Sequence, residues 1–135
     1  MKADWKMSVW RQIALTLCVA FAGDACSTTP ETPHPVQRVV LMWLKHPESA
    51  NDRAQLVRAA HSLQMMPGVV RVDTGRTVPM ENDRTDRSFD LGVAITFRDR
   101  ASLERYERDP RRSAAMERYL QPLVQRYVVY NLGTR

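Results

Sequence analysis

The segment VQRVVLMWLK, residues Val36 to Lys45, is apolar on both sides of an extended strand. Successive side chains of a strand point to opposite sides of its sheet. The apolar residues are Val39, Leu41 and Trp43 on one side, and Val40, Met42 and Leu44 on the other. A β-sheet built on this segment must therefore be covered on both faces, because neither face is polar enough to meet water.

A helix and two further strands are predicted after this segment. Asn51 or Asp52 caps a helix that runs to about Gln64, with apolar residues at helical spacing. The sequence MPGV then ends the helix, and a strand follows over 69–78, in which Gly75 marks a β-bulge. The next strand, 88–97, alternates strictly between apolar and other residues. Its apolar face is formed by Phe89, Leu91, Val93, Ile95 and Phe97.

Helix caps and prolines divide the C-terminal part of the chain. Asp99 caps a short helix that contains Tyr106, and Asp109 with the proline after it begins another helix. Pro122 ends that helix, and 126–132 form a fourth strand. The order strand, helix, strand, strand, helix, strand predicts an α+β fold of the ferredoxin-like βαββαβ type. Such a fold has a four-stranded antiparallel sheet with the helices on one face.

The face of the sheet opposite the helices is expected to be apolar as well. We assign Val40, Met42, Val128 and Tyr130 to it. A surface of this kind is unfavourable in water, and pairing of two sheets buries it. The sequence therefore predicts a homodimer whose two sheets close into an α/β barrel.

Length and charge limit the class of protein. A chain of 135 residues has room for one domain with a modest core. The 20 Lys and Arg residues exceed the 15 Asp and Glu residues by only five, and the two signs are interspersed, which argues against nucleic acid as a partner. His34, His46 and His61 lack metal-ligand spacing, and the chain has no glycine-rich phosphate loop. Neither a metal nor a cofactor is predicted.

Residues 1–25 have the order of a secretory signal peptide. Lys2, Lys6 and Arg11 precede an apolar run over 13–22, which is followed by small residues. As a helix this run would span about 15 Å, half of the roughly 30 Å hydrocarbon core of a membrane, so a permanent transmembrane segment is not expected. We predict an exported protein.

Cys26 is the predicted first residue after cleavage, and it resembles the acylated cysteine of a bacterial lipoprotein. Residues 26–35 form a Pro- and Thr-rich tether. Cys18 lies within the signal, so the mature chain has no second cysteine for a disulfide. Residues 23–24 depart from the usual lipobox, which leaves simple cleavage to a periplasmic protein as the alternative. Ser27 resembles the outer-membrane sorting signal and predicts anchoring in that membrane.

Several short motifs follow one another along residues 36–132. They are MPGVV at 66–70, Gly75, FDLGVAITF at 89–97, the spacing from Phe97 through Leu103 to Tyr106, Asp109-Pro110, and a final proline before the strand that ends in VVYNL. In this order the motifs resemble the stress-response A/B barrel (Dabb) family of dimeric α+β barrels. The resemblance implies a homodimer and a role related to stress.

The family's motif Tyr-x-x-His-Pro-x-His corresponds to residues 106–112. In the family's plant polyketide cyclase, the Tyr and the second His act as the acid/base pair. Here Tyr106 is kept, Asp109 and Arg112 stand at the two histidine positions, and Arg38 stands at the family's first-strand histidine. Arginine stays protonated near neutral pH and cannot act as a general base, so the cyclase mechanism does not carry over. Tyr106 is the remaining catalytic candidate.

Two guanidinium groups beside a hydroxyl suit the anionic group of a ligand. The predicted ligand-binding residues are Tyr106, Arg112, Arg38 and Asp90, the last as an acidic partner for Arg38. Tyr106 also fits a core position, and Asp109 fits a helix cap. We expect a protein that binds a small, partly hydrophobic, anionic molecule. The alternatives are a cofactor-independent enzyme of the cyclase or monooxygenase type, and a structural envelope module with a filled interior.

Overall fold

The computed structural model describes residues 33–81 and 84–133. The predicted signal peptide, Cys26 and most of the predicted tether lie outside these residues. The last part of the tether, 33–35, is exposed and has no regular structure. The first strand begins at Val36, where the sequence places the start of the domain.

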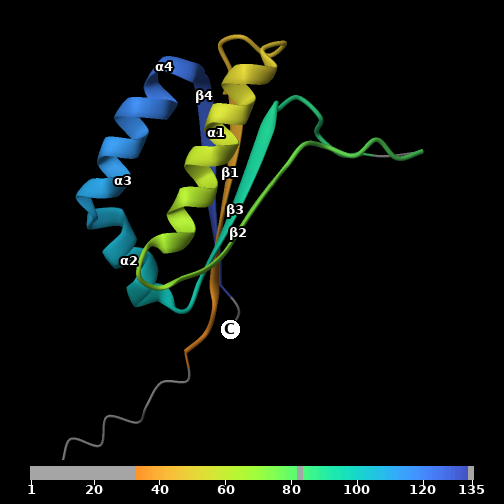
Figure 1. The fold of residues 1–135 in the computed structure, drawn as a ribbon. Helices are drawn as coiled ribbons and strands as arrows, with labels where there is room; N and C mark the ends of the chain where they lie inside the picture. The colour runs from red at the N-terminus through yellow and green to blue at the C-terminus, as the bar shows by residue number, and fades with distance from the viewer. Residues whose placement is uncertain (1–32, 82–83, 134–135) are drawn as a thin grey trace, which may run out of the picture. The chain divides into compact units, whose positions relative to one another are not determined.

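The secondary structure follows the predicted order (Figure 1). Its strands are β1 (Val36–Leu44), β2 (Val69–Gly75), β3 (Leu91–Phe97) and β4 (Val124–Gly133). Its helices are α1 (Ala50–Ser62), α2 (Arg100–Arg108), α3 (Pro110–Ala115) and α4 (Gln121–Leu123), with a 3-10 turn over Leu63–Met65 and a π-helical turn over Met116–Leu120.

The four strands form one antiparallel sheet in the order β2-β3-β1-β4. The helices lie together on one face of this sheet (Figure 1). The predicted ferredoxin-like α+β fold is therefore confirmed. Among the residues that the structure describes, no helix is both long and apolar enough to cross a membrane.

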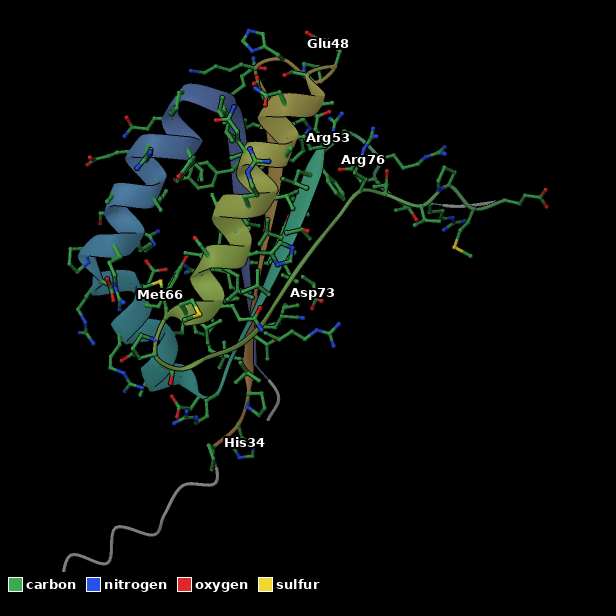
Figure 2. The ribbon with its side chains drawn as sticks, in the orientation of Figure 1. His34, Glu48, Arg53, Met66, Asp73 and Arg76 are labelled. Carbon is green, nitrogen blue, oxygen red and sulfur yellow. The ribbon has the colours of Figure 1, made fainter. Side chains whose placement is uncertain are left out.

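The core lies between the sheet and the helices. The inward side of β3 is almost completely buried, and Phe97 has no exposed surface. Figure 2 shows Arg53 near the start of α1 and Met66 near its other end, where the chain turns into β2. The buried apolar residues are Met42, Leu44, Leu56, Ala60, Met66, Val72, Leu91, Val93, Ile95, Phe97, Leu103, Tyr106 and Val124.

The predicted facing of β1 is wrong for Val40 and Met42. Met42 is only 3% exposed in the core, and both residues point to the helices. Val128 and Tyr130 are assigned correctly to the opposite face, because their partners in β1 alternate with Met42. The apolar residues of β1 and β4 on this helix-free face are Val39, Leu41, Trp43, Val128, Tyr130 and Leu132. Since β1 is apolar on both sides, its alternation cannot show which side meets the helices.

Phe89 also lies on the other side from the one predicted. β3 begins only at Leu91, and the Phe89 ring lies beside Gly92, whose position in the strand alternates with the buried residues. Phe89 therefore packs toward the helix-free face. The bulge predicted at Gly75 is wrong as well, because the register of β2 against β3 shifts between Val69 and Arg71.

Hydroxyl and carboxylate groups cap the helices. The Ser49 hydroxyl, rather than Asn51 or Asp52, caps α1 by accepting a hydrogen bond from the Asp52 amide at 3.2 Å. Asp99 caps α2 as predicted and accepts from the Ser102 amide at 2.7 Å. Pro122 marks the end of the last helical stretch as predicted, to within one residue, because α4 ends at Leu123 and β4 begins at Val124.

Candidate functional site

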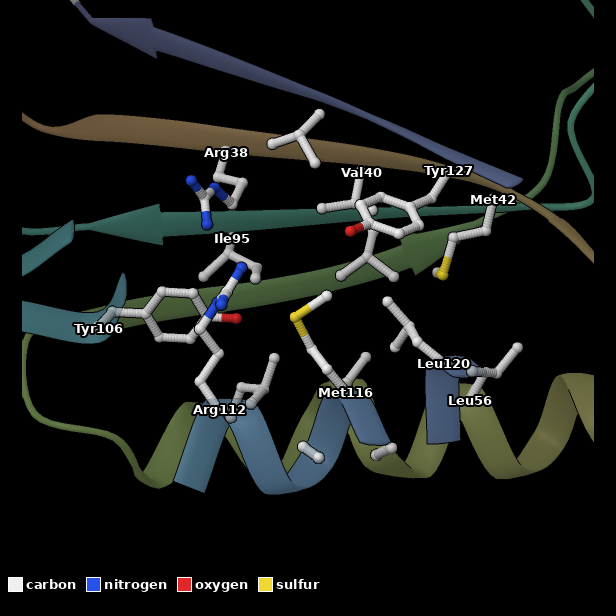
Figure 3. Close-up of a pocket in the computed structure, with 16 residues that line it drawn as sticks. Arg38, Val40, Met42, Leu56, Ile95, Tyr106, Arg112, Met116, Leu120 and Tyr127 are labelled. Atoms are coloured by element: carbon white, nitrogen blue, oxygen red, sulfur yellow. The ribbon is translucent and has the colours of Figure 1, made fainter. Parts of the chain in front are cut away.

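A cavity of about 90 Å³ lies between the sheet and the helices, within a single protomer. Most of its wall is apolar, and its residues come from β1, β3, β4, α1 with the 3-10 turn after it, α2, and the helical stretch after Pro110. Figure 3 shows Met42, Leu56 and Leu120 at one end and Met116 in the middle. The opposite end is formed by Arg38, Tyr106 and Arg112 (Figure 3). The cavity is therefore amphipathic along its length.

Arg38 is held at the charged end by two partners. Its Nε donates a hydrogen bond of 2.9 Å to the Asn131 side-chain oxygen on the neighbouring strand, with which it is in register. Its terminal nitrogen pairs with a carboxylate oxygen of Glu107 on α2. Its side chain is only 9% exposed, so these partners offset the desolvation of a buried charge.

The Glu107 carboxylate lies between the two arginines. Its second oxygen is 3.5 Å from a terminal nitrogen of Arg112. Two guanidinium groups therefore share one carboxylate, and the three side chains together carry one unit of excess positive charge. Such an arrangement attracts an additional anion.

The Tyr106 ring lies close to both guanidinium groups. Its centroid is 5.8 Å from the Arg38 carbon Cζ and 5.9 Å from that of Arg112, and it lies 5.1 Å from the centroid of the Phe97 ring. Burial raises the pKa of Tyr106 above its ordinary value, although the nearby Arg112 and Arg38 act in the opposite direction. The phenol is therefore protonated near neutral pH and offers a hydrogen-bond donor to the cavity.

The break between α2 and α3 positions these groups. Asp109 caps α3, where its carboxylate accepts from the Arg111 amide at 2.8 Å, and Pro110 occupies the first turn. The hydrogen bonds from Arg111 hold the pKa of Asp109 below its ordinary value. Asp109 does not line the cavity. Its extended backbone breaks the helix between α2 and α3, and across this break Glu107 and Arg112 approach each other.

Three of the four predicted binding residues come together, and Asp90 does not join them. The Asp90 carboxylate accepts a hydrogen bond of 2.8 Å from the Leu44 amide, near the opposite end of β1 from Arg38. Its proposed pairing with Arg38 is wrong, because Glu107 is the acidic partner.

Sequence reasoning missed Glu107, Asn131 and Tyr127. Glu107 belongs to a run of alternating charges that is typical of a solvated helix face, and only its position next to Tyr106 could have drawn notice. Tyr127 reaches into the cavity from β4, with its hydroxyl pointing toward the end where Arg38 lies (Figure 3). Within 33–81 and 84–133, no cluster of His, Cys, Asp or Glu has the arrangement of a metal site.

The fold and this site define a ferredoxin-like α+β protein with a small internal cavity that is cationic at one end. The model of the stress responsive A/B barrel domain, Dabb, matches residues 36–132. The chain belongs to this family.

Solved structures with the same fold come from bacteria and from a plant. A Dabb family protein from Mesorhizobium loti is 21% identical, with a TM-score of 0.62 over 76% of this chain and 98% of the other. A hydroxynitrile lyase from Passiflora edulis is 21% identical, with a TM-score of 0.64 over 76% of this chain and 95% of the other. A dimeric protein of unknown function from Thermobifida fusca is 14% identical, with a TM-score of 0.60 over 76% and 92%. No protein with a curated description matches the sequence.

Proposed function

We propose that this domain binds a small, partly apolar molecule that carries one negative charge, in a role related to stress. The observation that carries the proposal is the excess positive charge of the Arg38, Glu107 and Arg112 group at the end of an otherwise apolar cavity. A carboxylate or phenolate bound there would accept charge-assisted hydrogen bonds from Arg112 and a further one from the neutral Tyr106 hydroxyl.

The size and lining of the cavity define the rest of the ligand. Its volume of about 90 Å³ is well below the roughly 300–1,000 Å³ of sites for drug-sized molecules. The apolar part of the ligand therefore consists of a few carbon atoms or one small ring, packed against Met116, Ile95 and Val40.

Benzoate and its neutral isostere benzamide test this proposal by isothermal titration. We expect benzoate to bind more tightly than benzamide. The Arg112→Met variant should lose about tenfold or more of the benzoate affinity, since a hydrogen bond to a charged group contributes about 1.5–3 kcal/mol. The control is Arg111→Met, because Arg111 is on the same helix, pairs with Asp109 and does not line the cavity. Equal binding of benzoate and benzamide, or an equal loss in both variants, would contradict the proposal.

An enzyme of the cyclase or monooxygenase type is the second candidate. It would need a group that removes a proton from the substrate, whereas the raised pKa of Tyr106 suits this residue to donate one. The hydroxynitrile lyase from Passiflora edulis is similar to this chain in fold, and its identity of 21% does not extend that similarity to activity. A structural envelope module ranks third, because a packed interior would leave no cavity between Arg38, Tyr106 and Arg112.

We further propose that the domain is a homodimer whose sheets pair through the helix-free face to form a barrel. Tyr130 and Leu132 on this face are 52% and 54% exposed in the protomer, and structures of the same fold from Thermobifida fusca and Bacteroides fragilis are described as dimeric. The variant Tyr130→Asp should convert the dimer to a monomer in analytical ultracentrifugation, because it would bury an unpaired charge. Arg58→Asp, on the exposed side of α1, is the control. A Tyr130→Asp variant that stays dimeric would contradict this interface.

Export and acylation at Cys26 complete the proposal. They are supported by the basic residues and apolar run of 1–25 and by the single cysteine at the predicted mature N-terminus. Mass spectrometry of the protein from its native envelope should show a chain that begins at Cys26 with a lipid mass added. An unprocessed chain that begins at Met1 would contradict export, whereas a processed chain without lipid would indicate a periplasmic protein.

A further inference from the structure

Glu107 does not line the cavity itself, but its carboxylate engages the two guanidinium groups that form the charged end of the cavity. It contacts a terminal nitrogen of Arg38 through one oxygen and lies 3.5 Å from Arg112 through the other. A carboxylate between two guanidinium groups is the arrangement that a bound carboxylate ligand would adopt. The chain therefore supplies its own anion to the site.

Of the three charged side chains, Glu107 is the most exposed, at 37% compared with 9% for Arg38 and 24% for Arg112. The Oε1 atom that contacts Arg38 is itself buried, so displacement of the carboxylate would expose it to solvent. Arg38 is also tied to Asn131, so it stays in place when Glu107 moves.

A second, outer pocket of about 400 Å³ adjoins the cavity and could receive the displaced carboxylate. Arg38 lines both spaces, and Glu107 lines the outer one together with Arg100 and Glu104. The ion pair of Arg38 and Glu107 thus stands between the inner cavity and the outer pocket. A rotation of the Glu107 side chain toward the outer pocket would place its carboxylate in a larger and more polar space.

We propose that Glu107 is an internal competitor for the ligand's anionic group, which displaces it from Arg38 and Arg112 on binding. This inference rests on the proposed function and adds a mechanism of selectivity to it. When the cavity is empty, Glu107 offsets the charge of two partly desolvated guanidinium groups, which would otherwise be costly. When an anion enters, one carboxylate replaces another, so the charge of the site does not change. A neutral molecule cannot make this exchange and leaves Glu107 in place.

The variant Glu107→Gln tests the exchange, because it removes the charge and keeps the size of the side chain. We expect it to bind benzoate about tenfold more tightly than the wild-type protein, since the ligand no longer competes with a resident carboxylate. Its affinity for benzamide should not change. The melting temperature of the ligand-free variant should fall, and benzoate should raise it by more than in the wild-type protein.

The matched control is Glu117→Gln. Glu117 is an exposed residue of the π-helical turn Met116–Leu120, and it lines neither the inner cavity nor the outer pocket. This variant should bind benzoate as the wild-type protein does. An equal gain in both variants would point to a general change in surface charge and would overturn the inference.

The outcomes separate this inference from the proposed function. If the wild-type protein binds benzoate through Arg112 but Glu107→Gln binds it equally or less tightly, Glu107 is not a competitor and the proposed function still stands. If neither protein binds benzoate, both fail. Should Glu107→Gln not fold, a structure of the wild-type protein with benzoate decides the question, because a carboxylate of Glu107 that still bridges both arginines overturns the inference.

Discussion

The two faces of β1 are similarly apolar in sequence, but the two faces of the sheet differ in what covers them. On the helix side, Met42 and Ile95 are 3% and 2% exposed beneath α1 and the helical stretch after Pro110. On the helix-free face, Tyr130 and Leu132 remain about half exposed in the protomer. The difference shows that an apolar sequence pattern predicts burial of a surface but does not identify the element or chain that buries it. The charged site lies on the helix side, where burial in a low dielectric strengthens the interactions of each charge and raises the cost of leaving it unpaired.

The largest contrast between the two faces is expected from truncation of an apolar side chain on each. Phe97→Ala should reduce the free energy of unfolding by about 3–5 kcal/mol, because it leaves a cavity in a fully packed core. Leu132→Ala should cost about 0.5 kcal/mol or less when the protomer is measured alone at high dilution. Urea unfolding monitored by circular dichroism gives both values. Similar losses in the two variants would show that the helix-free face is already packed within the protomer.

A glycine beneath α2 should show the next largest effect. Gly68 has φ of +85°, and a Cβ there would lie 2.5 Å from the Ser102 side chain. We expect Gly68→Ala to lower the free energy of unfolding by about 1–3 kcal/mol through backbone strain and this contact. Gly75→Ala is the control, because nothing lies within 4 Å of a Cβ at that position. The idea fails if the two variants have the same melting temperature.

A smaller effect is expected from Arg126 on the helix-free face. Its guanidinium carbon is 3.8 Å from the centroid of the Trp43 ring. The two residues lie opposite each other in the register of β4 against β1. Arg126→Ala should reduce the free energy of unfolding by about 0.5–1 kcal/mol, because this cation–π contact is lost at an exposed site. Arg126→Lys should recover part of the loss. Unfolding followed by tryptophan fluorescence tests both variants.

The smallest effect, confined to alkaline pH, concerns Tyr106. Burial raises the pKa of this phenol in the folded state above its ordinary value of 10.0. The stability that it contributes is therefore complete below pH 10, and it is lost as the pH rises through the folded-state value. Tyr106→Phe should lose less stability than the wild-type protein between neutral pH and pH 11, as measured by urea unfolding. Parallel pH profiles would show that Tyr106 titrates as it does in the unfolded chain.

Local patterns predicted most of the fold and only part of the site. The alternation of Leu91 to Phe97 and the caps at Asp99 and Asp109 lie within a few residues of what they determine, so they could be read from the sequence. The partners of Arg38 could not, because Glu107 and Asn131 reach it from another helix and another strand. Tyr127 joins the cavity for the same reason, through the pairing of β4 with β1.

The sequence by itself determined the order of the elements, the ferredoxin-like topology and the apolar character of both faces of β1. These follow from periodicity and capping, which act over one or two turns of chain. Only the tertiary structure decided which face the helices cover, and that Glu107, rather than Asp90, compensates Arg38. Such choices depend on how distant segments meet, and a strand that is apolar on both sides carries no local signal to distinguish them.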